Sequence, residues 1–431
     1  MNAMRRQHAQ TGEELVNHTS ADQLYGRNTE LAMQNLRARG RGMRQVPEFL
    51  SAYALVKAAA AKANLELGCL PTATADAIVQ AAAEVTAGAH SAQFPLPLLQ
   101  GGGGTSANMN LNEVLATRAT ELLREAGQFT TIHPNDHVNR SQSTNDTYPT
   151  AMAITLFRLA RGPLDALTRV EDSLRDLAAR YGDTQRLGRT CLQDAVPLSI
   201  RDTHLAQARA VGRVRAELGE VVTALSQVPL GATAVGTGIG APPGYADAAV
   251  RHLAELTGHN LATADDPFDM LAHLDPYAKL ASAASRTAIV LAKIASDLRF
   301  LSSGPRAGIA EVTLPPLQPG SSIMPGKVNP IIPEQVLQLS FRVRGCAHTV
   351  ELAVSAGELE LNVMEPVILD ALVTALSDVE DAAVSLSDKC LRGLRWNTDV
   401  VDEHLQASLG GLVTMAAETG YEGATAFSAR T

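Results

Sequence analysis

Apolar residues recur every three or four positions along several long stretches of this chain, the spacing that gives an α-helix one buried face. Four stretches show it: 164–177, 205–225, 280–298 and 333–347. Each is long enough for several turns, and Pro333 suits the first turn of the last one. Four such helices predict a bundle, and hence an all-α fold.

The connections between these helices are rich in Gly, Ser, Thr and Asn, which bring backbone N–H groups and short side-chain donors close to a ligand. They lie at 100–110, 133–150, 188–197, 229–244 and 318–330. Composition shifts near residues 143 and 396. We therefore expect an N-terminal helical domain at 1–143, a central long-helix bundle at 144–396 and a short C-terminal helical domain at 397–431.

Composition narrows the function. Of 431 residues, 45% are apolar and only 4% aromatic, which favours helices packed through small side chains. The net charge of −9 argues against a nucleic-acid partner. The four cysteines lie far apart without a CxxC pair, so neither disulfides nor a zinc ribbon is expected. Residues 1–15 contain no apolar leader, and charges interrupt every long apolar run. We expect a cytoplasmic protein with no membrane partner.

The segment QPGSSIMPGKVNP at 318–330 resembles a phosphate loop only superficially, because Val328 follows Lys327 where Ser or Thr is required. It offers hydroxyls, a cation and an amide, which could deprotonate a substrate and hold its carboxylate. These groups belong to Ser321, Ser322, Lys327 and Asn329. The alternative is a solvated loop before the helix at Pro333.

Two further segments carry short polar side chains. QGGGGTSANMN at 100–110 lacks the third glycine of a dinucleotide fingerprint, and leaves Thr105 and Ser106 beside exposed backbone, or forms a flexible loop. Residues 143–146 either bind an anion or cap a helix running from Pro149, and the two roles are compatible.

Two other groups of residues could suggest a metal site or a nucleophile, but a structural role is expected for both. His133, Asp136 and His137 form an HxxDH string, but Pro134 disfavours the helix that would bring both imidazoles to one face. A structural histidine pair is expected there, and no metal site. Cys191 has no neighbouring histidine as a base, so it is expected to be a packed or pocket-lining thiol.

Taken in order along nearly the whole chain, these segments resemble the aspartase/fumarase superfamily. The matching segments are GGTSANMNLNEV at 103–114, GRTCLQDAVP at 188–197 and GSSIMPGKVNP at 320–330. Two more, LSSGPRAGIAEVTLPPLQPGSSIMPGKVNPIIPE and GELELNVMEPVI, look closer to aspartase than to fumarase. Gly103 stands where fumarases usually have serine.

This resemblance implies a homotetramer in which the long helices of four subunits form a common core, with each active site shared by three subunits. The substrate would be a small C4 dicarboxylate, and no cofactor is expected. Ser321 would be the general base, and Lys327 would be the second catalytic residue. Lys327, Asn329 and Thr190 would bind substrate carboxylates. The remaining substrate-binding positions would be Thr105, Ser106, Ser143, Thr144, Asn145, Cys191, Ser322 and Met324, with Ser143 and Thr144 on the β-carboxylate and Thr105 and Asn145 on the amino group.

The reaction implied is reversible anti-elimination of ammonia from L-aspartate through an aci-carboxylate. A C–H beside a carboxylate is a very weak acid, so preorganised donors must stabilise the dianion. Cys191 stands where fumarases carry the histidine that, with a glutamate matched here by Glu334, activates water. The alternatives are therefore a lyase for an N-substituted aspartate, a fumarate hydratase and a catalytically silent homologue.

Overall fold

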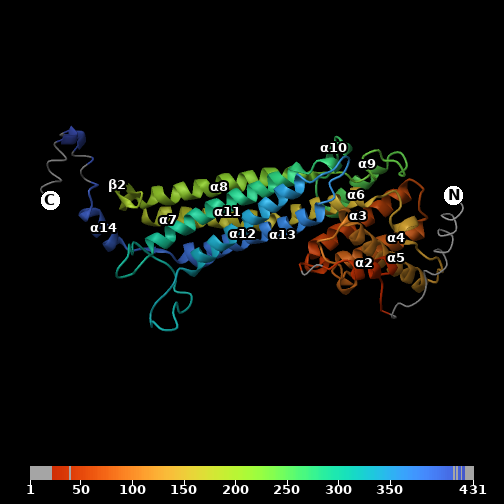
Figure 1. The fold of residues 1–431 in the computed structure, drawn as a ribbon, viewed down its shortest axis with the longest axis horizontal. Coiled ribbons are helices and arrows are strands. Elements are labelled where there is room, and N and C mark those ends of the chain that lie inside the picture. Colours follow the sequence, from red (N-terminus) through yellow and green to blue (C-terminus); the bar gives the residue numbers. More distant parts are fainter. Residues whose placement is uncertain (1–21, 38–39, 411–412, 414–415, 419, 423–431) are drawn as a thin grey trace. The chain divides into compact units, whose positions relative to one another are not determined.

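The computed structural model describes residues 22–37, 40–410, 413, 416–418 and 420–422, and nearly all of its regular structure is helical (Figure 1). The predicted all-α fold is confirmed. The expectation about residues 1–15 lies outside the described residues, as does the part of the predicted C-terminal domain from 423 to 431. Among the described helices, none is long and apolar enough to cross a membrane.

The described chain divides into two compact units that combine distant segments. Unit 1 contains the described residues up to Leu159 together with Val221–Leu280 and His348–Val373. Unit 2 contains Ala160–Glu220, Ala281–Ala347 and the described residues from Thr374 onwards. The predicted domains are continuous segments with boundaries near residues 143 and 396, whereas each of these units combines several segments. The predicted boundaries therefore stay a prediction.

Unit 1 is organised around an alanine-rich helix, α3 (Pro47–Glu66), which packs against α4, α6 and α9. Most of its side chains are buried, because alanine lets neighbouring helices approach closely. The rings of Phe49 and Tyr148 lie 5.2 Å apart in the same core. The helices of this unit are α2 (Arg27–Asn35), α3, α4 (Thr72–Thr86), α5 (Thr105–Glu125), α6 (Thr144–Leu159), α9 (Tyr245–Thr257) and α10 (Pro267–Ala272).

The four predicted long helices are present. They are α7 (Arg161–Tyr181), α8 (Ile200–Thr223), α11 (Asp275–Leu301) and α12 (Ile331–Val354), and a fifth, α13 (Glu365–Ser385), joins them. Helix α12 begins two residues before Pro333, so the proline still falls in the first turn, where its missing N–H costs no hydrogen bond. A shorter helix, α14 (Thr398–Ala407), follows.

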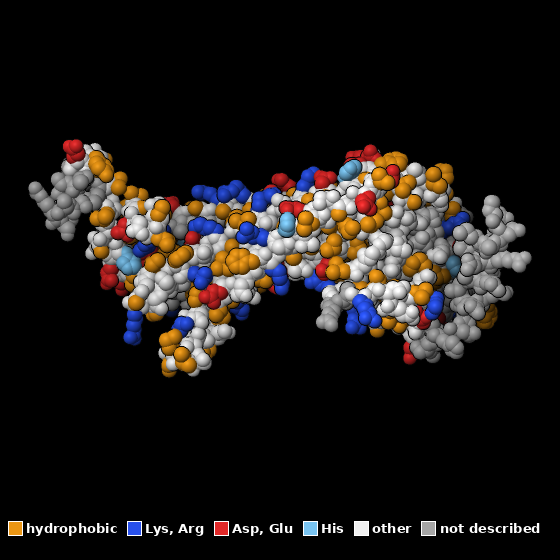
Figure 2. Space-filling model, viewed as in Figure 1, with side chains coloured by type: hydrophobic (Ala, Val, Ile, Leu, Met, Phe, Trp, Pro, Cys, Tyr) orange, Lys and Arg blue, Asp and Glu red, His pale blue; other side chains and the backbone are white. Residues whose placement is uncertain are grey.

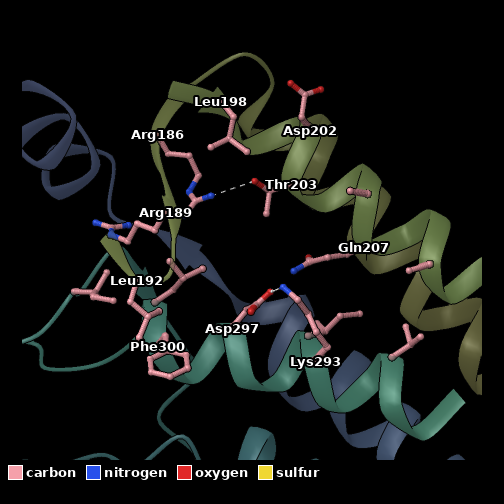
Figure 3. Close-up of a pocket in the computed structure, with 16 residues that line it drawn as sticks. Arg186, Arg189, Leu192, Leu198, Asp202, Thr203, Gln207, Lys293, Asp297 and Phe300 are labelled. Atoms are coloured by element: carbon pink, nitrogen blue, oxygen red, sulfur yellow. Dashed lines mark hydrogen bonds and ion pairs between the residues drawn. The ribbon is translucent and has the colours of Figure 1, made fainter. Parts of the chain in front are cut away.

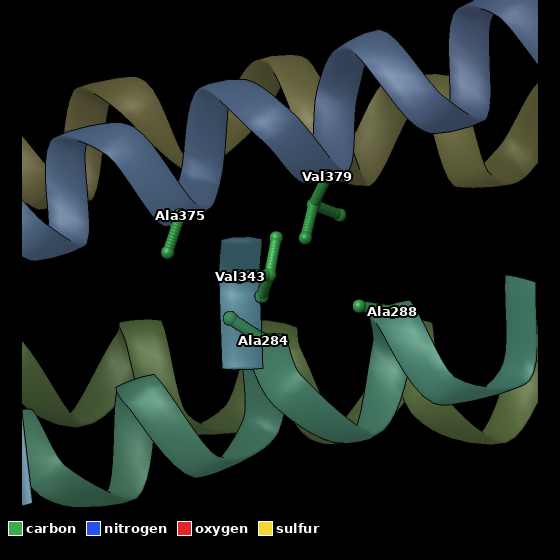
Figure 4. Close-up of a cluster of buried hydrophobic side chains, with 5 residues drawn as sticks. All are labelled: Ala284, Ala288, Val343, Ala375 and Val379. Carbon is green, nitrogen blue, oxygen red and sulfur yellow. The ribbon is translucent and has the colours of Figure 1, made fainter. Parts of the chain in front are cut away.

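Small side chains hold the long helices of unit 2 together, as the composition predicted. Figure 4 shows Ala284 and Ala288 of α11, Val343 of α12, and Ala375 and Val379 of α13 meeting in one buried cluster. Alanine and valine bring the helix backbones close and leave little space for voids.

Short strands and turns complete the chain. The strands are β1 (Gln185–Thr190), β2 (Gln193–Ser199), β3 (Gln227–Val228), β4 (Ala262–Thr263), β5 (Val312–Thr313) and β6 (Arg395–Trp396). They pair as β1–β2 and β5–β6, both antiparallel, and β3–β4, which is parallel. The short helical turns are η1 (Met43–Gln45), η2 (Ser91–Gln93), η3 (Gly102–Gly104), η4 (Pro134–Val138), η5 (Ala224–Ser226), η6 (Leu386–Cys390) and η7 (Leu391–Gly393).

The β1–β2 hairpin was not expected from the sequence, which indicated only a polar connection at 188–197. Its two turn residues, Cys191 and Leu192, both have positive φ, although neither is a residue that usually marks such a turn. A buried carboxylate anchors the hairpin: Glu311 Oε1 lies 2.6 Å from Arg189 Nη2 and 2.9 Å from His404 Nδ1 of α14. The hairpin is therefore fixed to α14 and to the segment around Glu311.

Candidate active site

The start of α6 is a capping arrangement of short polar side chains that are buried or half-buried. Ser143 Oγ accepts the N–H of Asn145 at 3.2 Å, and Asp146 Oδ1 accepts the N–H of Ser143 at 3.0 Å. The predicted capping role is confirmed, because such reciprocal bonds satisfy the free donors of a helix N-terminus. The expected start at Pro149 is wrong: α6 begins at Thr144, and Pro149 lies inside it. Proline has no N–H, so Pro149 removes one hydrogen bond from the helix. Burial of the first turns of α6 in the core of unit 1 outweighs that loss.

A cavity of about 400 Å³ lies beside this helix start, and both Ser143 and Thr144 contribute to its wall. Thr144 Oγ1 accepts a hydrogen bond of 3.1 Å from Asn108 Nδ2 of α5. The other lining residues come from α5 and from the segments before α6 and α9: Asn108, Met109, Asn139, Ser141, Gln142, Thr233, Ala234, Ile239 and Gly240. Amides and hydroxyls predominate among them, and such groups suit a carboxylate ligand.

A buried hydrogen-bond network supports one wall of this cavity. Asn139 Oδ1 accepts from Lys57 Nζ at 3.0 Å, and from Asn108 Nδ2 and Asn112 Nδ2 at 3.1 Å each. Lys57 Nζ also donates to Gln142 Oε1 at 3.0 Å. Because three donors share one carbonyl oxygen, the amide of Asn139 has a single orientation, and the wall is preorganised before any ligand binds.

A buried carboxylate fastens the start of α6 to the glycine-rich segment before α9. Asp146 Oδ2 accepts the N–H groups of Gly231 at 3.1 Å and Thr233 at 2.9 Å. Asn145 adds a second link, because its Nδ2 donates to the carbonyl of Ala234 at 2.7 Å. Burial raises the pKa of Asp146 to about 7, and burial likewise lowers the pKa of Lys57 to about 7.

Thr105 and Ser106 begin α5 after a run of glycines, and neither lines the 400 Å³ cavity. Thr105 is exposed, and its hydroxyl donates to the carbonyl of Gly102 at 2.7 Å. Gly104 has φ +86°, and an added Cβ there would overlap the ring of Tyr148. Glycine is therefore required at this position both by the backbone conformation and by the packing of α5 on α6.

In unit 2, the loop at 318–330 carries the predicted base. Ser321 Oγ accepts the backbone N–H groups of Ile323 at 3.2 Å and Met324 at 3.0 Å. The loop is closed by two bonds, from Gly320 N to the Lys327 carbonyl at 2.8 Å and from Asn329 Nδ2 to the Gly320 carbonyl at 2.7 Å. An added Cβ on Gly320 would crowd both of these contacts.

Most of this loop is exposed, including Ser322, Met324 and Lys327, whereas Ser321 and Asn329 are half-buried. In Figure 1 it is the teal loop that projects from the long helices of unit 2, and Figure 2 shows hydrophobic side chains at its tip. Ile323 is 85% exposed and Met324 is 51% exposed.

Thr190 and Cys191 lie at the tip of the β1–β2 hairpin, on a different element of unit 2. Both are exposed, so the first of the two expectations for Cys191, a thiol packed within the chain, is wrong, whereas a pocket-lining thiol stays a prediction. The physical reason is that the hairpin turns at Cys191 and Leu192, which leaves Thr190 and Cys191 at an exposed tip.

A second cavity, of about 510 Å³, lies in unit 2 between the hairpin, α8 and α11 (Figure 3). Arg186 donates to Thr203 Oγ1 at 3.4 Å at its edge, and Lys293 pairs with Asp297. Much of the remaining lining is apolar. None of the site residues predicted from the sequence lines it.

The histidine string before α6 has a local structural role. His133 Nδ1 accepts the N–H of Asn135 at 3.2 Å and that of Asp136 at 3.1 Å, which caps η4. His137 Nδ1 accepts the N–H of His133 at 2.9 Å. In the part of the chain that the structure describes, no three His, Cys, Asp or Glu side chains group as metal ligands would.

Comparison with known proteins places this geometry in a family. Residues 17–345 match a family described as lyase. An aspartate ammonia-lyase from Bacillus sp is 40% identical over 402 residues, which are 93% of this chain and 86% of that protein. The chain belongs to this lyase family, the aspartase/fumarase superfamily.

Two further superfamily members show the range of relatives. A class II fumarate hydratase from Halalkalibacterium halodurans is 40% identical over 409 residues, 94% of this chain and 88% of its own length. The solved structure of a fumarate lyase:delta crystallin from Brucella melitensis aligns with a TM-score of 0.92 and 37% identity. That alignment covers 96% of this chain and 90% of the other. The resemblance seen in the sequence is thereby confirmed.

The structure also identifies residues that the sequence did not single out. Asn108, Asn139 and Thr233 line the cavity with Ser143 and Thr144, and each lies inside a polar segment already recognised as unusual. Lys57 supports that wall from the buried side, together with Asp146, for which the sequence had indicated only a place at the start of a helix. A lysine in the middle of the alanine-rich stretch of α3 was the one available signal, since an unpaired cation is costly in a helix core.

Proposed function

We propose that this lyase catalyses the reversible anti-elimination of ammonia from L-aspartate to give fumarate, with Ser321 as the general base. The Ser321 oxygen takes the Cβ proton, the C–N bond breaks, and ammonia leaves with the bonding electron pair as the C=C bond forms. A serine hydroxyl is a weak base, so its alkoxide must be stabilised by nearby donors. The two backbone N–H groups on Ser321 Oγ are the observation that favours this role.

Charge stabilisation is assigned to the polar residues of both units. Removing the Cβ proton places a second negative charge on the β-carboxylate, and that charge must be met by donors already in position. We assign the β-carboxylate to Ser143 and Thr144, other carboxylate contacts to Lys327, Asn329 and Thr190, and the amino group to Thr105 and Asn145. Ser106, Cys191, Ser322 and Met324 complete the proposed contact surface.

The proposal includes a homotetramer in which three subunits contribute to each site. The pocket at Ser143 and the Ser321 loop belong to different units of the chain. The exposed apolar side chains of the loop, Ile323 and Met324, would be covered when another subunit completes the site. The C4 dicarboxylate is then enclosed by loop closure, which excludes water from the alkoxide.

A hydratase reaction is the less favoured alternative. It needs a group that holds and activates water, and an exposed thiol at Cys191 is a poor substitute for an imidazole. Glu334 lies 3.8 Å from Arg299, and position 191 offers it no histidine partner. The same replacement at Cys191 could enlarge the amine pocket, so an N-substituted aspartate is the second candidate substrate.

Absorbance of fumarate provides the test. The purified protein is incubated with L-aspartate, L-malate and a panel of N-substituted aspartates, and fumarate formation is followed. Turnover of L-aspartate supports the proposal, whereas preference for a substituted compound would identify the second candidate. Fumarate formed from L-malate alone would establish the hydratase, and no product from any compound would establish a catalytically silent homologue.

A further inference from the structure

The glycine-rich segment before α9 contributes to the wall of the 400 Å³ cavity, yet the reaction proposed above gives it no role. Its contribution comes from Thr233, Ala234, Ile239 and Gly240. Two of these residues are tied to the proposed β-carboxylate site, because Thr233 N–H donates to Asp146 and the Ala234 carbonyl accepts from Asn145. The segment is therefore fixed relative to Ser143 and Thr144.

Thr233 has a backbone conformation that its side chain disfavours. Its φ is +58°, in the left-handed region, where a β-branched residue is a rare outlier. Such conformations persist only when the surrounding structure enforces them, and they gather at binding and catalytic sites. Here the enforcing group is Asp146 Oδ2, which accepts the N–H of Thr233 at 2.9 Å.

The hydroxyl of Thr233 has no hydrogen-bond partner, although the residue is only 4% exposed. A buried hydroxyl without a partner costs free energy, so folding alone favours valine at this position. The strained backbone and the unsatisfied donor occur at the same residue, which lines the cavity beside Ser143 and Thr144. A carboxylate in this cavity would supply the missing acceptor.

We propose that Thr233 is a substrate-binding residue whose hydroxyl donates a hydrogen bond to the dicarboxylate held by Ser143 and Thr144, with Asp146 as its positioning residue. This inference rests on the proposed function, because it takes the cavity to be the carboxylate site. It adds the segment before α9 to the groups that recognise the substrate.

Succinate, a C4 dicarboxylate that has no amine to lose, is the probe. Its affinity for the full-length protein is measured by calorimetry for the wild type, Thr233→Val and Thr233→Ser. A hydrogen bond to a charged group implies that Thr233→Val weakens succinate binding by about 10- to 100-fold, whereas Thr233→Ser keeps the hydroxyl and most of the affinity. Thr168→Val is the control, because Thr168 is exposed on α7 and lies outside the cavity lining.

Thermal unfolding separates ligand contact from packing. Thr233→Val should unfold at the same temperature as the wild type or higher, because it removes an unsatisfied buried hydroxyl. Weaker succinate binding together with unchanged or raised stability supports the inference. Equal affinity of Thr233→Val and the wild type would overturn it, as would a wild type that does not bind succinate.

The positioning role of Asp146 is tested by a double-mutant cycle. Asp146→Asn replaces one acceptor oxygen, so it should also weaken succinate binding. If Asp146 acts through Thr233, the double variant loses little more affinity than Thr233→Val alone, and additive losses would refute that role. The proposed reaction is judged separately: a wild type that binds succinate through Thr233 but forms no fumarate from L-aspartate would overturn the reaction and leave this inference standing.

Discussion

The cavity beside α6 and the loop that carries Ser321 hold their polar groups in opposite ways. In the cavity wall, hydrogen bonds join segments far apart in the chain, such as Lys57 to Asn139 and Asp146 to Thr233, and the donors are buried. In the loop, the bonds join neighbours such as Ser321 and Met324, and most residues are exposed. The binding wall is thus built into the core of its unit, whereas the base is carried on a locally closed loop.

This difference matches two separate tasks, the stabilisation of charge and the admission of substrate. Stabilising the charge of an aci-carboxylate needs donors that do not move when charge develops, which favours a buried network. Admitting and releasing the substrate needs an element that moves without unfolding its unit, which favours an exposed loop. Substitutions that break the buried network of the wall, such as Asp146→Asn, should therefore affect stability together with binding, whereas removal of the Ser321 hydroxyl from the loop should affect activity alone.

The largest effect is expected from Ser321→Ala. Loss of a general base typically lowers the rate by about 10²- to 10⁴-fold. Because Ser321 Oγ contacts only its own loop, the thermal midpoint should not change. Fumarate formation from L-aspartate and circular dichroism on heating provide the two measurements.

Ser302→Ala, which removes a hydroxyl at the end of α11, is the control and should keep the wild-type rate. Near-normal turnover by Ser321→Ala would refute its assignment as the base.

Next in size is the contrast between two glycine substitutions. Gly104→Ala combines a positive φ with overlap of the Tyr148 ring, so a cost of about 2–5 kcal/mol is expected from left-handed strain and overpacking. Gly326→Ala, in the Ser321 loop, has a similar φ of +84° but nothing within 4 Å, so only about 1–2 kcal/mol is expected. Denaturant unfolding measures both.

Equal destabilisation by the two alanines would show that the packing of α5 on α6, next to the cavity, tolerates an added methyl group as well as the exposed loop does, and the comparison would fail.

A smaller effect is expected from pH. Burial raises the pKa of Asp146 from 3.8 to about 7, so its contribution to stability is fully present below pH 3.8 and is lost as the pH rises through about 7. The titratable groups that face it are Lys57, Tyr53 and Tyr245. The wild type should therefore lose stability relative to Asp146→Asn across this window, as judged by unfolding midpoints.

A stability difference between the wild type and Asp146→Asn that does not change between these pH values would show that Asp146 titrates normally.

Lys57→Met should show the opposite pH dependence of stability. Burial lowers the pKa of Lys57 from 10.5 to about 7, so its contribution is fully present above pH 10.5 and is lost as the pH falls through about 7, and the variant should gain stability relative to the wild type as the pH falls across this window and keep that gain below it.

The long helices could be predicted because their apolar positions repeat at helical spacing, and α7, α8, α11 and α12 all formed where that spacing occurs. The capping role of Ser143 and Asp146 was also predictable, since it depends on residues three positions apart. The start of α6 was not, because Pro149 is a local signal that tertiary packing overrides. The hairpin at β1–β2 escaped prediction because its turn lacks glycine or asparagine.

The sequence predicted those site residues that stand in conspicuous polar segments. It did not predict the roles that depend on contacts with residues far away in the chain. Ser143, Ser321 and Lys327 stand in conspicuous polar segments. The importance of Lys57, Asp146 and Thr233 depends on contacts with residues more than eighty positions away, as in the bond from Thr233 to Asp146. No local pattern in a single sequence records such a contact.

The most direct test of the account is complementation between subunits. Ser321→Ala and Thr144→Val are co-expressed, so that mixed tetramers form. If the base and the carboxylate pocket of one site come from different chains, random mixing gives about one intact site in four, and roughly a quarter of the wild-type fumarate formation returns. Activity no greater than that of the two separate variants would contradict the claim that the two units of different chains combine into one active site.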